Sequence, residues 1–523
     1  MVKILLTKYQ WYNNENTWVT GFIRIGGMLL VKEELLKYFS AADSFPKFET
    51  ILKSANGQFS VVINSPGGIL AASDRMRNYP LFYSMVDYQY IISDDCYYLA
   101  GIQSETRFNP DAVNCFLAGG FVINNLTLIN NVYQVEAGGY IIISDSHKKG
   151  YYHDSCLEPT LSKDFYLWVN ELEILIDKVF GCYLKSLNNK FIAIPLSGGY
   201  DSRLIAAMCA KFHPENVLCY TYGIKNNEEV APAREAAKRL GIKWINIVYD
   251  EELIRDFLDK EVFKEYYPYV SELSGMFFMQ EYFAVKHLKE EGLIPGDCVF
   301  IPGFSGDMIA GSHLSPAMNI FTYGDQIARM IFKEFFKLVN LDREDKSKVI
   351  ELLRGKIGPG KLSAWKAIES FDMKERQAKF VVNSAKVYKY FGYDYIIPFW
   401  DKEFIDFFAS VPFNLKLNKK LYDFILTKKI FPEKDINLKG EINPSPTQKR
   451  FQRFKDTIKP FVPDYLKNLF IERESPIFYD EITKMMLNDL VENHVIVPKQ
   501  PNYYNSYITQ WYLLKTRELF KII

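Results

Sequence analysis

Between residues 191 and 250 the chain alternates short apolar runs with stretches of helical periodicity. The runs 191–196 (FIAIPL), 217–223 (VLCYTYG) and 244–250 (WINIVYD) have the length of strands, and residues 202–212 and 229–240 between them have a helical pattern. Parallel neighbours in a sheet need a crossover of about a dozen residues or more, which a helix supplies. The alternation therefore predicts a doubly wound parallel α/β unit.

The segments on either side of this unit differ in pattern. Residues 1 to about 145 are rich in short strand-type runs, namely 59–63, 68–73, 88–93 and 138–144, separated by Gly, Pro, Asn and Asp. The polar stretch 147–164 lacks periodicity and predicts a linker, 165–189 predicts a helix, and 251–523 is mostly helical with one further strand-like run at 297–303. We therefore predict two domains, residues 1–150 and 160–523.

Composition excludes several classes of protein. The 63 Lys and Arg balance the 63 Asp and Glu, which gives no global attraction to nucleic acid or anionic lipid. Hydrophobic residues make up 48% of the chain, which argues against disorder, and no stretch reaches the ~18 apolar residues of a membrane span. The seven cysteines form no C-x-x-C pair, which favours buried thiols in a reducing compartment. We expect a cytoplasmic protein without nucleic-acid or membrane partners.

One loop carries most of the chemical information. Residues 194–203 (IPLSGGYDSR) lie between a predicted strand and a predicted helix. Gly198 and Gly199 permit close backbone approach and positive φ, so that successive amides can face an anion at the helix N-terminus. Ser197 and Ser202 add hydroxyl donors, and the carboxylate of Asp201 is placed to hold Mg²⁺ on a bound phosphate. The loop lacks the spacing and the lysine of a Walker A motif.

A second glycine-rich turn follows the last strand-like run. Residues 297–313 (DCVFIPGFSGDMIAGSH) again lead from a strand into a turn that carries an acidic residue, Asp307. Two such turns at neighbouring carboxyl ends of parallel strands would bring Asp201 and Asp307 to one metal–pyrophosphate cluster.

At this point the sequence resembles the asparagine synthetase family, which includes β-lactam synthetase and lasso-peptide cyclases. The matching segments are 56–63, 72–83 and 116–141 in the first half, and LSGGYDS (196–202), GFSGDMIAGS (303–312) and IPFWDKEF (397–404) in the second. The resemblance implies an Ntn-hydrolase-like β-rich sandwich, related to a class II glutaminase domain, followed by an adenine-nucleotide α-hydrolase-like (PP-loop) sheet with a helical C-terminal part.

The resemblance also implies ATP and Mg²⁺ as cofactors. Asp201 and Asp307 would be the metal ligands. The expected nucleotide-binding residues are Leu196, Ser197, Gly198, Gly199, Asp201, Ser202, Thr221, Tyr222, Gly223, Gly303, Ser305 and Gly306.

Three departures from the family pattern bear on function. The family's glutaminase nucleophile is a cysteine at the mature N-terminus, whereas position 2 here is Val2 and no Cys precedes Cys96, so we expect no glutamine hydrolysis. Relatives carry Glu or Tyr as a proton acceptor where this chain has Phe304, which leaves His313 and Glu375 as alternative bases. The family's lysine that offsets the charge of pyrophosphate corresponds best to Lys439, with Lys434 as the alternative.

These features predict an ATP-dependent amide-forming ligase that adenylates a carboxylate, releases pyrophosphate and transfers ammonia or an amine to the acyl group. Three carboxylates stay open: aspartate, an acidic sugar of a surface polysaccharide, and a peptide side chain closed onto an amine as in lasso-peptide cyclases. We favour the broad amidating function over peptide cyclisation. The alternatives from other classes are a tRNA-modifying enzyme and a non-catalytic scaffold, and a homodimer is left open.

Overall fold

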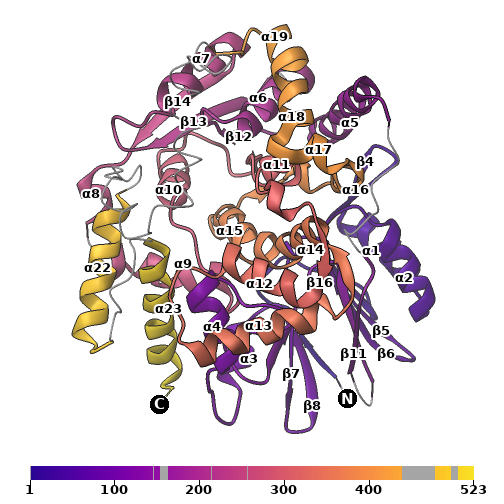
Figure 1. Cartoon of the computed structure of the whole chain (residues 1–523), viewed down its shortest axis with the longest axis vertical. Coiled ribbons are helices and arrows are strands. Elements are labelled where there is room, and N and C mark those ends of the chain that lie inside the picture. Colours follow the sequence, from indigo (N-terminus) through magenta and orange to yellow (C-terminus); the bar gives the residue numbers. More distant parts are fainter. Residues whose placement is uncertain are drawn as a thin grey trace.

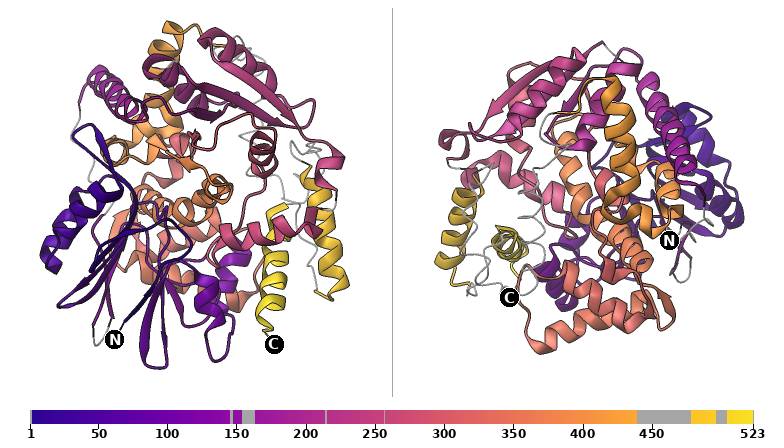
Figure 2. Two further views of the ribbon diagram at one scale, coloured as in Figure 1. Left: turned by 180° about the vertical axis from the view of Figure 1, so that it is seen from behind. Right: turned by 45° about the horizontal axis from the view of Figure 1, so that its top comes forward.

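The chain forms two halves that pack against each other (Figure 1), and the computed structural model describes residues 2–144, 147–153, 163–213, 215–255, 257–438, 478–495 and 504–522. Figure 2 shows a β-rich N-terminal half and a mainly parallel sheet at opposite ends of the molecule, with helices between them.

Two sheets build the N-terminal half. The four-stranded sheet has the order β1 (Lys3–Leu5), β8 (Gln89–Ser93), β7 (Phe82–Val86), β9 (Val132–Gln134). The seven-stranded sheet has the order β11 (His147–Tyr151), β10 (Gly139–Ile143), β6 (Gly68–Ser73), β5 (Gly57–Ser65), β3 (Thr17–Ile25), β2 (Tyr12–Asn13), with β4 (Met28–Val31) paired to β3. Apart from the parallel pair β1–β8, the neighbouring strands run antiparallel.

Alternating apolar side chains let both sheets bury two faces. Val62 and Ala71 of the larger sheet share a core with Leu81 and Tyr83 at the smaller one. On the other face of the larger sheet, Val61 packs with helices α1 (Lys32–Ser40) and α2 (Phe45–Ser54), while the other face of the smaller sheet packs with α3 (Cys96–Gly101) and α4 (Pro110–Gly119). The half is therefore a four-layer helix–sheet–sheet–helix sandwich.

A five-stranded parallel sheet organises the second half. Its order is β14 (Lys243–Val248), β13 (Val217–Gly223), β12 (Ile192–Pro195), β15 (Val299–Phe300), β18 (Asp394–Tyr395). Every neighbouring pair is parallel. Helix α6 (Tyr200–Phe212) connects β12 to β13, and α7 (Val230–Leu240) connects β13 to β14. Strand order therefore reverses between β12 and β15, where open α/β sheets form a crevice at their carboxyl edge.

Helices make up most of the remaining chain. They are α5 (Phe165–Ser186), α8 (Glu251–Ile254), α9 (Glu261–Ser271), α10 (Tyr282–Glu290), α11 (Gly306–Ile309), α12 (Gly324–Phe335), α13 (Arg343–Ile357), α14 (Ala364–Phe371), a π-helix (Asp372–Val381), α15 (Val382–Tyr390), α16 (Lys402–Ser410), α17 (Phe413–Lys416), α18 (Lys420–Ile425), α19 (Phe431–Glu433), α22 (Tyr479–Glu492) and α23 (Tyr504–Phe520). Among the described helices, none has both the length and the apolar character to cross a membrane.

The predicted fold class is confirmed: strands β12, β13, β14 and β15 coincide with the predicted runs, and the N-terminal half is a β-rich sandwich. The linker prediction is wrong for residues 147–151, which form β11 on β10, because a polar edge strand has no apolar alternation to reveal it. Residues 154–162, where the predicted domain boundary falls, lie outside the described residues, so the boundary stays a prediction.

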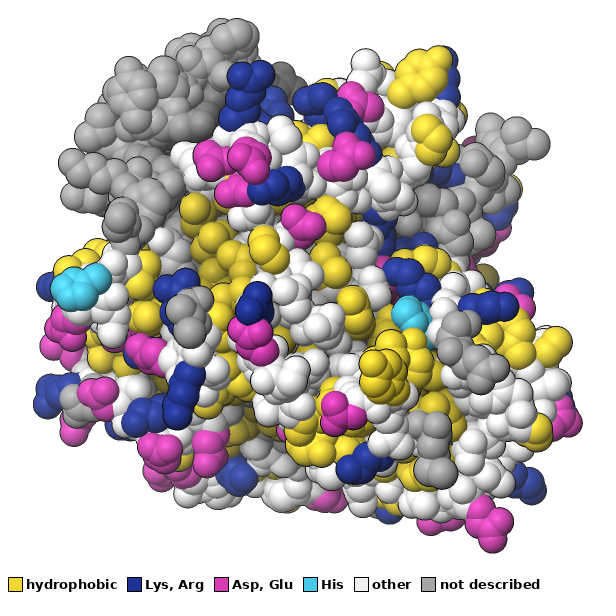
Figure 3. Space-filling model, turned by 90° about the horizontal axis from the view of Figure 1, so that it is seen from below, with side chains coloured by type: hydrophobic (Ala, Val, Ile, Leu, Met, Phe, Trp, Pro, Cys, Tyr) yellow, Lys and Arg dark blue, Asp and Glu magenta, His cyan; other side chains and the backbone are white. Residues whose placement is uncertain are grey.

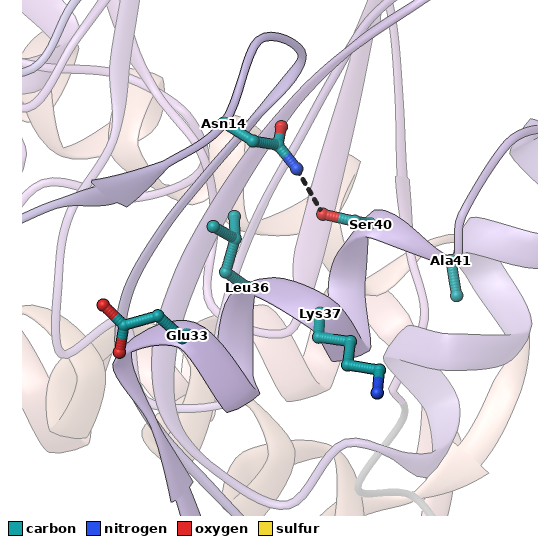
Figure 4. Close-up of a pocket in the computed structure, with 6 residues that line it drawn as sticks. All are labelled: Asn14, Glu33, Leu36, Lys37, Ser40 and Ala41. Atoms are coloured by element: carbon teal, nitrogen blue, oxygen red, sulfur yellow. Dashed lines mark hydrogen bonds between the residues drawn. The ribbon is translucent and has the colours of Figure 1, made fainter.

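The surface shows no single dominant charge on the face drawn in Figure 3, where Lys and Arg side chains alternate with Asp and Glu. A shallow pocket lies on α1 and is lined by Asn14, Glu33, Leu36, Lys37, Ser40 and Ala41 (Figure 4). Its edges are joined by a hydrogen bond of 3.0 Å from Asn14 Nδ2 to Ser40 Oγ. None of the predicted site residues lines this pocket.

Candidate nucleotide site

The predicted phosphate loop lies at the crevice of the parallel sheet. It leaves β12 at Pro195 and enters α6, whose N-cap is Gly199. The Ser197 N–H donates to Ser202 Oγ at 3.1 Å, and the Gly199 N–H donates to Ser197 Oγ at 3.1 Å. The two serine hydroxyls therefore hold the loop in shape by accepting from its own amides.

The two glycines act through close approach alone. Neither Gly198 nor Gly199 has a positive φ, so that part of the prediction is wrong. A Cβ on Gly198 would lie 3.0 Å from Pro232 Cγ of α7, and one on Gly199 would lie 3.1 Å from Ser197 Oγ. Glycine is thus favoured because the loop passes close to α7 and to its own serine.

The second turn packs directly on this loop. A Cβ on Gly303 would lie 2.9 Å from the Ser202 nitrogen, and one on Gly306 would lie 2.6 Å from Asp201 Cγ and Oδ2. Ser305 adopts a left-handed conformation with φ of 66°, and its hydroxyl donates to Gln377 Oε1 of the π-helix at 2.7 Å. The hydrogen bond to Gln377 therefore anchors the turn to the π-helix, and its glycines allow close contact with Asp201.

The two predicted metal ligands lie in contact. Asp201 is in the first turn of α6, and its Oδ2 accepts from the backbone N–H of Asp307, in the first turn of α11, at 2.7 Å. Its Oδ1 accepts from the Tyr422 hydroxyl of α18 at 2.8 Å. Asp201 is partly buried, whereas Asp307 is exposed. The prediction that both turns converge is consistent with this geometry, and their role as metal ligands stays a prediction.

Electrostatics at Asp201 suit a cation. Burial and the neighbouring Asp307 carboxylate raise the pKa of Asp201 to about 7, against the opposing hydrogen bond from Tyr422. Among the described residues, no group of three or more His, Cys, Asp and Glu lies close enough to hold a metal ion. The donor set fits Mg²⁺, which is commonly bound by one or two carboxylates together with substrate phosphates.

The predicted adenine-side residues follow β13. The Thr221 hydroxyl donates to the Leu196 carbonyl at 2.7 Å and accepts from the Trp244 indole N–H at 2.9 Å. The Tyr222 ring stacks on Tyr249 with a centroid separation of 5.6 Å, and Gly223 has a φ of 131°. These contacts join the ends of β12, β13 and β14, so the residues predicted to bind nucleotide lie along one sheet edge.

The three predicted catalytic residues have different surroundings. Glu375 is buried in ion pairs with Lys356 and Lys379 and accepts from the Asn124 N–H of the N-terminal half at 3.1 Å. It therefore lies at the contact between halves. His313 follows α11 in the same turn as Asp307, and its Nε2 lies 3.9 Å from Glu369 Oε2. Lys439 lies outside the described residues, and the alternative Lys434 is the partly exposed C-cap of α19.

Sequence reasoning missed three residues that the structure brings to this region: Tyr422, Glu369 and Lys416. Tyr422 bonds Asp201, and the buried ammonium of Lys416 contacts Glu369 Oε1 at 2.5 Å. All three lie on helices far along the chain from the glycine-rich turns. The sequence carries no local signal for such contacts, since they depend on how α14, α17 and α18 pack.

The fold and the site define an α/β synthetase-type domain joined to a helix–sheet–sheet–helix sandwich. The family model described as "Asparagine synthase" matches residues 190–492, which is more than half of the chain, and the chain belongs to this family. The resemblance noted in the sequence is thereby confirmed.

Individual relatives are distant or match in part. A probable glutamine-hydrolysing asparagine synthetase of Acanthamoeba polyphaga mimivirus is 45% identical over 58 residues, which is 11% of this chain and 10% of that protein. The microcin J25-processing protein McjC of Escherichia coli is 22% identical over 383 residues, 69% of this chain and 67% of that protein. Glutamine-hydrolysing asparagine synthetase 1 of Bacillus subtilis is 26% identical over 221 residues, 41% of this chain and 34% of that protein. These matches thus span about a tenth and about a third of the two asparagine synthetases.

Proposed function

We propose that the chain is an ATP-dependent ligase that adenylates a carboxylate and transfers ammonia or an amine to it. Membership of the asparagine synthase family supports this reaction class. The observation that carries the proposal is the contact between Asp201 and the Asp307 N–H at the point where the sheet reverses its strand order. ATP would lie with its phosphates between these two turns.

Each residue of the two turns would have a separate role in binding Mg²⁺ and ATP. The loop 197–202 would bind the phosphates through its serine hydroxyls and the N-terminus of α6. Asp201 and Asp307 would hold Mg²⁺, which offsets the charge of the pyrophosphate leaving group when bound. Tyr422 would keep the Asp201 carboxylate oriented through its hydrogen bond. Lys439 would supply a further cation, in keeping with the sequence prediction.

We propose further that the sandwich has no glutaminase function and serves as a scaffold. In residues 2–144, its two thiols, Cys96 and Cys115, are buried. Burial raises the pKa of both thiols well above the usual range, which removes the thiolate that a nucleophile needs. Ammonia or an amine would then come from solution.

A peptide substrate is the second candidate. The match to the microcin J25-processing protein extends over 69% of this chain and so reaches beyond the segment that the asparagine synthase model covers. This similarity favours a carboxylate on a peptide side chain, with an amine of the same peptide as the acceptor. A free amino acid and an acidic sugar are the other carboxylates to compare.

The test is ATP–pyrophosphate exchange by the purified full chain with Mg²⁺. L-Aspartate, D-glucuronate and a peptide with one internal Glu are each supplied alone, and amide formation is then measured with ammonia or the peptide's own amine. Carboxylate-dependent exchange supports the ligase, and the active carboxylate identifies its substrate class. Absence of exchange with all three, together with absence of ATP binding, would leave the scaffold as the better description.

A further inference from the structure

A buried cluster of three titratable side chains lies beside the candidate nucleotide site. We call it the His313 cluster, and it consists of His313 after α11, Glu369 on α14 and Lys416 on α17. The side chains of His313 and Glu369 are 11% and 12% exposed, and that of Lys416 is 0% exposed. In the view of Figure 1, α11 lies to the left of α17 and above α14. Burying polar and charged side chains costs free energy unless they are paired, so a buried cluster of three such groups suggests a function.

Three polar atoms of this cluster have no hydrogen-bond partner among the described residues. They are both ring nitrogens of His313 and Oε2 of Glu369, and all three are buried. The large majority of buried polar side-chain atoms in native proteins have a hydrogen-bond partner, and a catalytic role is one of the explanations for an exception. The Nε2 and Oε2 atoms face each other at 3.9 Å, a separation that a catalytic hydrogen bond can close once substrate is bound.

The backbone ties this cluster to Asp201 from two directions. Along α11, Gly306 touches Asp201, and the four-residue helix of roughly 6 Å then leads to His313. Along α17 and α18, Lys416 belongs to the cluster, and Tyr422 donates to Asp201. Gly311 has a φ of 105°, and a Cβ there would lie 2.4 Å from the Lys416 carbonyl, so the two routes are also in contact.

The other predicted base is already fully engaged. Glu375 contacts the ammonium groups of Lys356 and Lys379 and accepts from the Asn124 N–H. These three contacts hold the Glu375 carboxylate in place, so it has little freedom to reach a substrate. Phe304, at the family's usual position, has no atom that takes a proton. His313 is therefore the better-placed acceptor of the two predicted ones.

We propose that His313 is the general base of the amide-forming step and that Glu369 is its positioning residue. This assignment rests on the proposed function. The lone pair of the amine attacks the acyl carbon of the adenylate, and the new carbon–nitrogen bond forms as the carbon–oxygen bond to phosphate breaks. That electron pair leaves with AMP, and a proton of the amine passes to an unpartnered ring nitrogen of His313. The contact from Lys416 to Glu369 Oε1 fixes the Glu369 side chain beside His313, where it would steady the imidazolium.

Adenylation, measured as ATP–pyrophosphate exchange, and amide formation are assayed separately. A loss confined to amide formation distinguishes the base assignment from the proposed ligase function. With the carboxylate that the wild-type chain activates, His313→Ala should leave ATP–pyrophosphate exchange within about twofold while amide formation with ammonia falls roughly 10²–10⁴-fold. Hydroxylamine depends much less on a base, because its nitrogen becomes far more acidic than that of ammonia once it is bonded to the acyl carbon and can release its proton to water. Hydroxamate formation by His313→Ala should therefore stay near that of the wild-type chain.

Matched variants test the two roles. Glu369→Gln should lower kcat for amide formation roughly tenfold or more, with the KM for ammonia and the exchange rate unchanged, since it only misorients the base. His494→Ala, at an exposed position after α22, is the control and should leave both half-reactions unchanged.

Amide formation within twofold of wild type by His313→Ala, or equal losses of exchange and amide formation, would overturn the base assignment while leaving the ligase intact. Absence of exchange by the wild-type chain would instead remove the proposed function, and the assignment with it.

Discussion

Arg24 and Asp401 join the two halves of the molecule through a buried two-point ion pair. Arg24 Nε lies 2.8 Å from Asp401 Oδ2, and Arg24 Nη2 lies 3.0 Å from Oδ1. Asp401 also accepts from Asn56 Nδ2 and from the Tyr183 hydroxyl, and its side chain is 0% exposed. Asp401 belongs to the segment that resembles the family's synthetase half, so this half depends on the sandwich for its charge balance.

We expect Arg24→Ala to destabilise the chain by about 3–5 kcal/mol, because it leaves the Asp401 carboxylate buried without a cation. Thermal or urea unfolding of the full chain measures this. The matched control is Lys47→Ala, whose partner Asp43 is exposed, and whose loss should cost less than about 1 kcal/mol. Equal changes in the free energy of unfolding for the two substitutions would show that the buried pair stabilises the fold no more than an exposed pair does.

The contact between Gly306 and Asp201 predicts a sharp difference between two glycines. Gly306→Ala would place a methyl group 2.6 Å from the Asp201 carboxylate and displace it, so we expect exchange activity to fall at least tenfold. Gly296→Ala, in open space and without a positive φ, should keep wild-type exchange. The two variants are compared in the same exchange assay, and near-normal activity of Gly306→Ala would contradict the assigned site.

Asp201→Ala should abolish adenylation, because it removes the proposed metal ligand. It should leave the fold intact, since the carboxylate lies at a crevice and its removal opens no apolar cavity. Exchange activity and the unfolding midpoint are measured together. Asp177→Ala, which loses only a partly exposed pair with Lys211, is the control. Turnover close to wild type by Asp201→Ala would be incompatible with a role in holding Mg²⁺.

The purified chain should release no glutamate from glutamine. Cys96 and Cys115 are buried with raised thiol pKa values, so neither supplies a thiolate. A coupled glutamate assay, run beside amide formation with ammonia, measures this directly. Glutamate release that Cys96→Ala or Cys115→Ala abolishes would refute the scaffold role of the sandwich.

Glu281 predicts a pH dependence of stability. Burial raises its pKa from 4.5 to about 7, against hydrogen bonds from Tyr220 and Tyr388. The folded chain therefore holds a proton between about pH 4.5 and pH 7 that the unfolded chain releases, so this group's contribution to stability falls as pH rises through that range.

Glu281→Gln removes this loss, and at pH 8 we expect it to be more stable than wild type by about 3 kcal/mol, with no gain near pH 4.5. The difference in unfolding free energy between variant and wild type, followed from pH 4.5 to pH 8, isolates the group. Glu290→Gln at an exposed position is the control and should show no such trend. A flat difference for Glu281→Gln would contradict the raised pKa.

Apolar runs and helical periodicity in the sequence predict those helices and strands that are long enough to show such a pattern. Strands β12 and β13 and helix α5 follow from apolar runs and helical periodicity. The two-residue strand β18 and the two-stranded sheet of β16 (Phe321–Tyr323) and β17 (Lys361–Ser363) were missed, because two or three residues show no period. The polar sequence of the edge strand β11 resembles a loop, so the sequence predicts a linker there.

The candidate site divides in the same way. The two glycine-rich turns are local in sequence, and the sheet topology explains why Asp201 and Asp307 meet. Glu375 and His313 could not be ranked from sequence, because the difference lies in partners from distant segments: Lys356 for one and Glu369 for the other. Tyr422 was missed for the same reason.

The ion pair at Asp401 also limits how this chain can be engineered. A catalytic half excised for fusion to another protein would carry an acid whose counter-ion stays behind on β3. Such a transplant would need a neutral residue at position 401, or a substitute guanidinium supplied by its new neighbour.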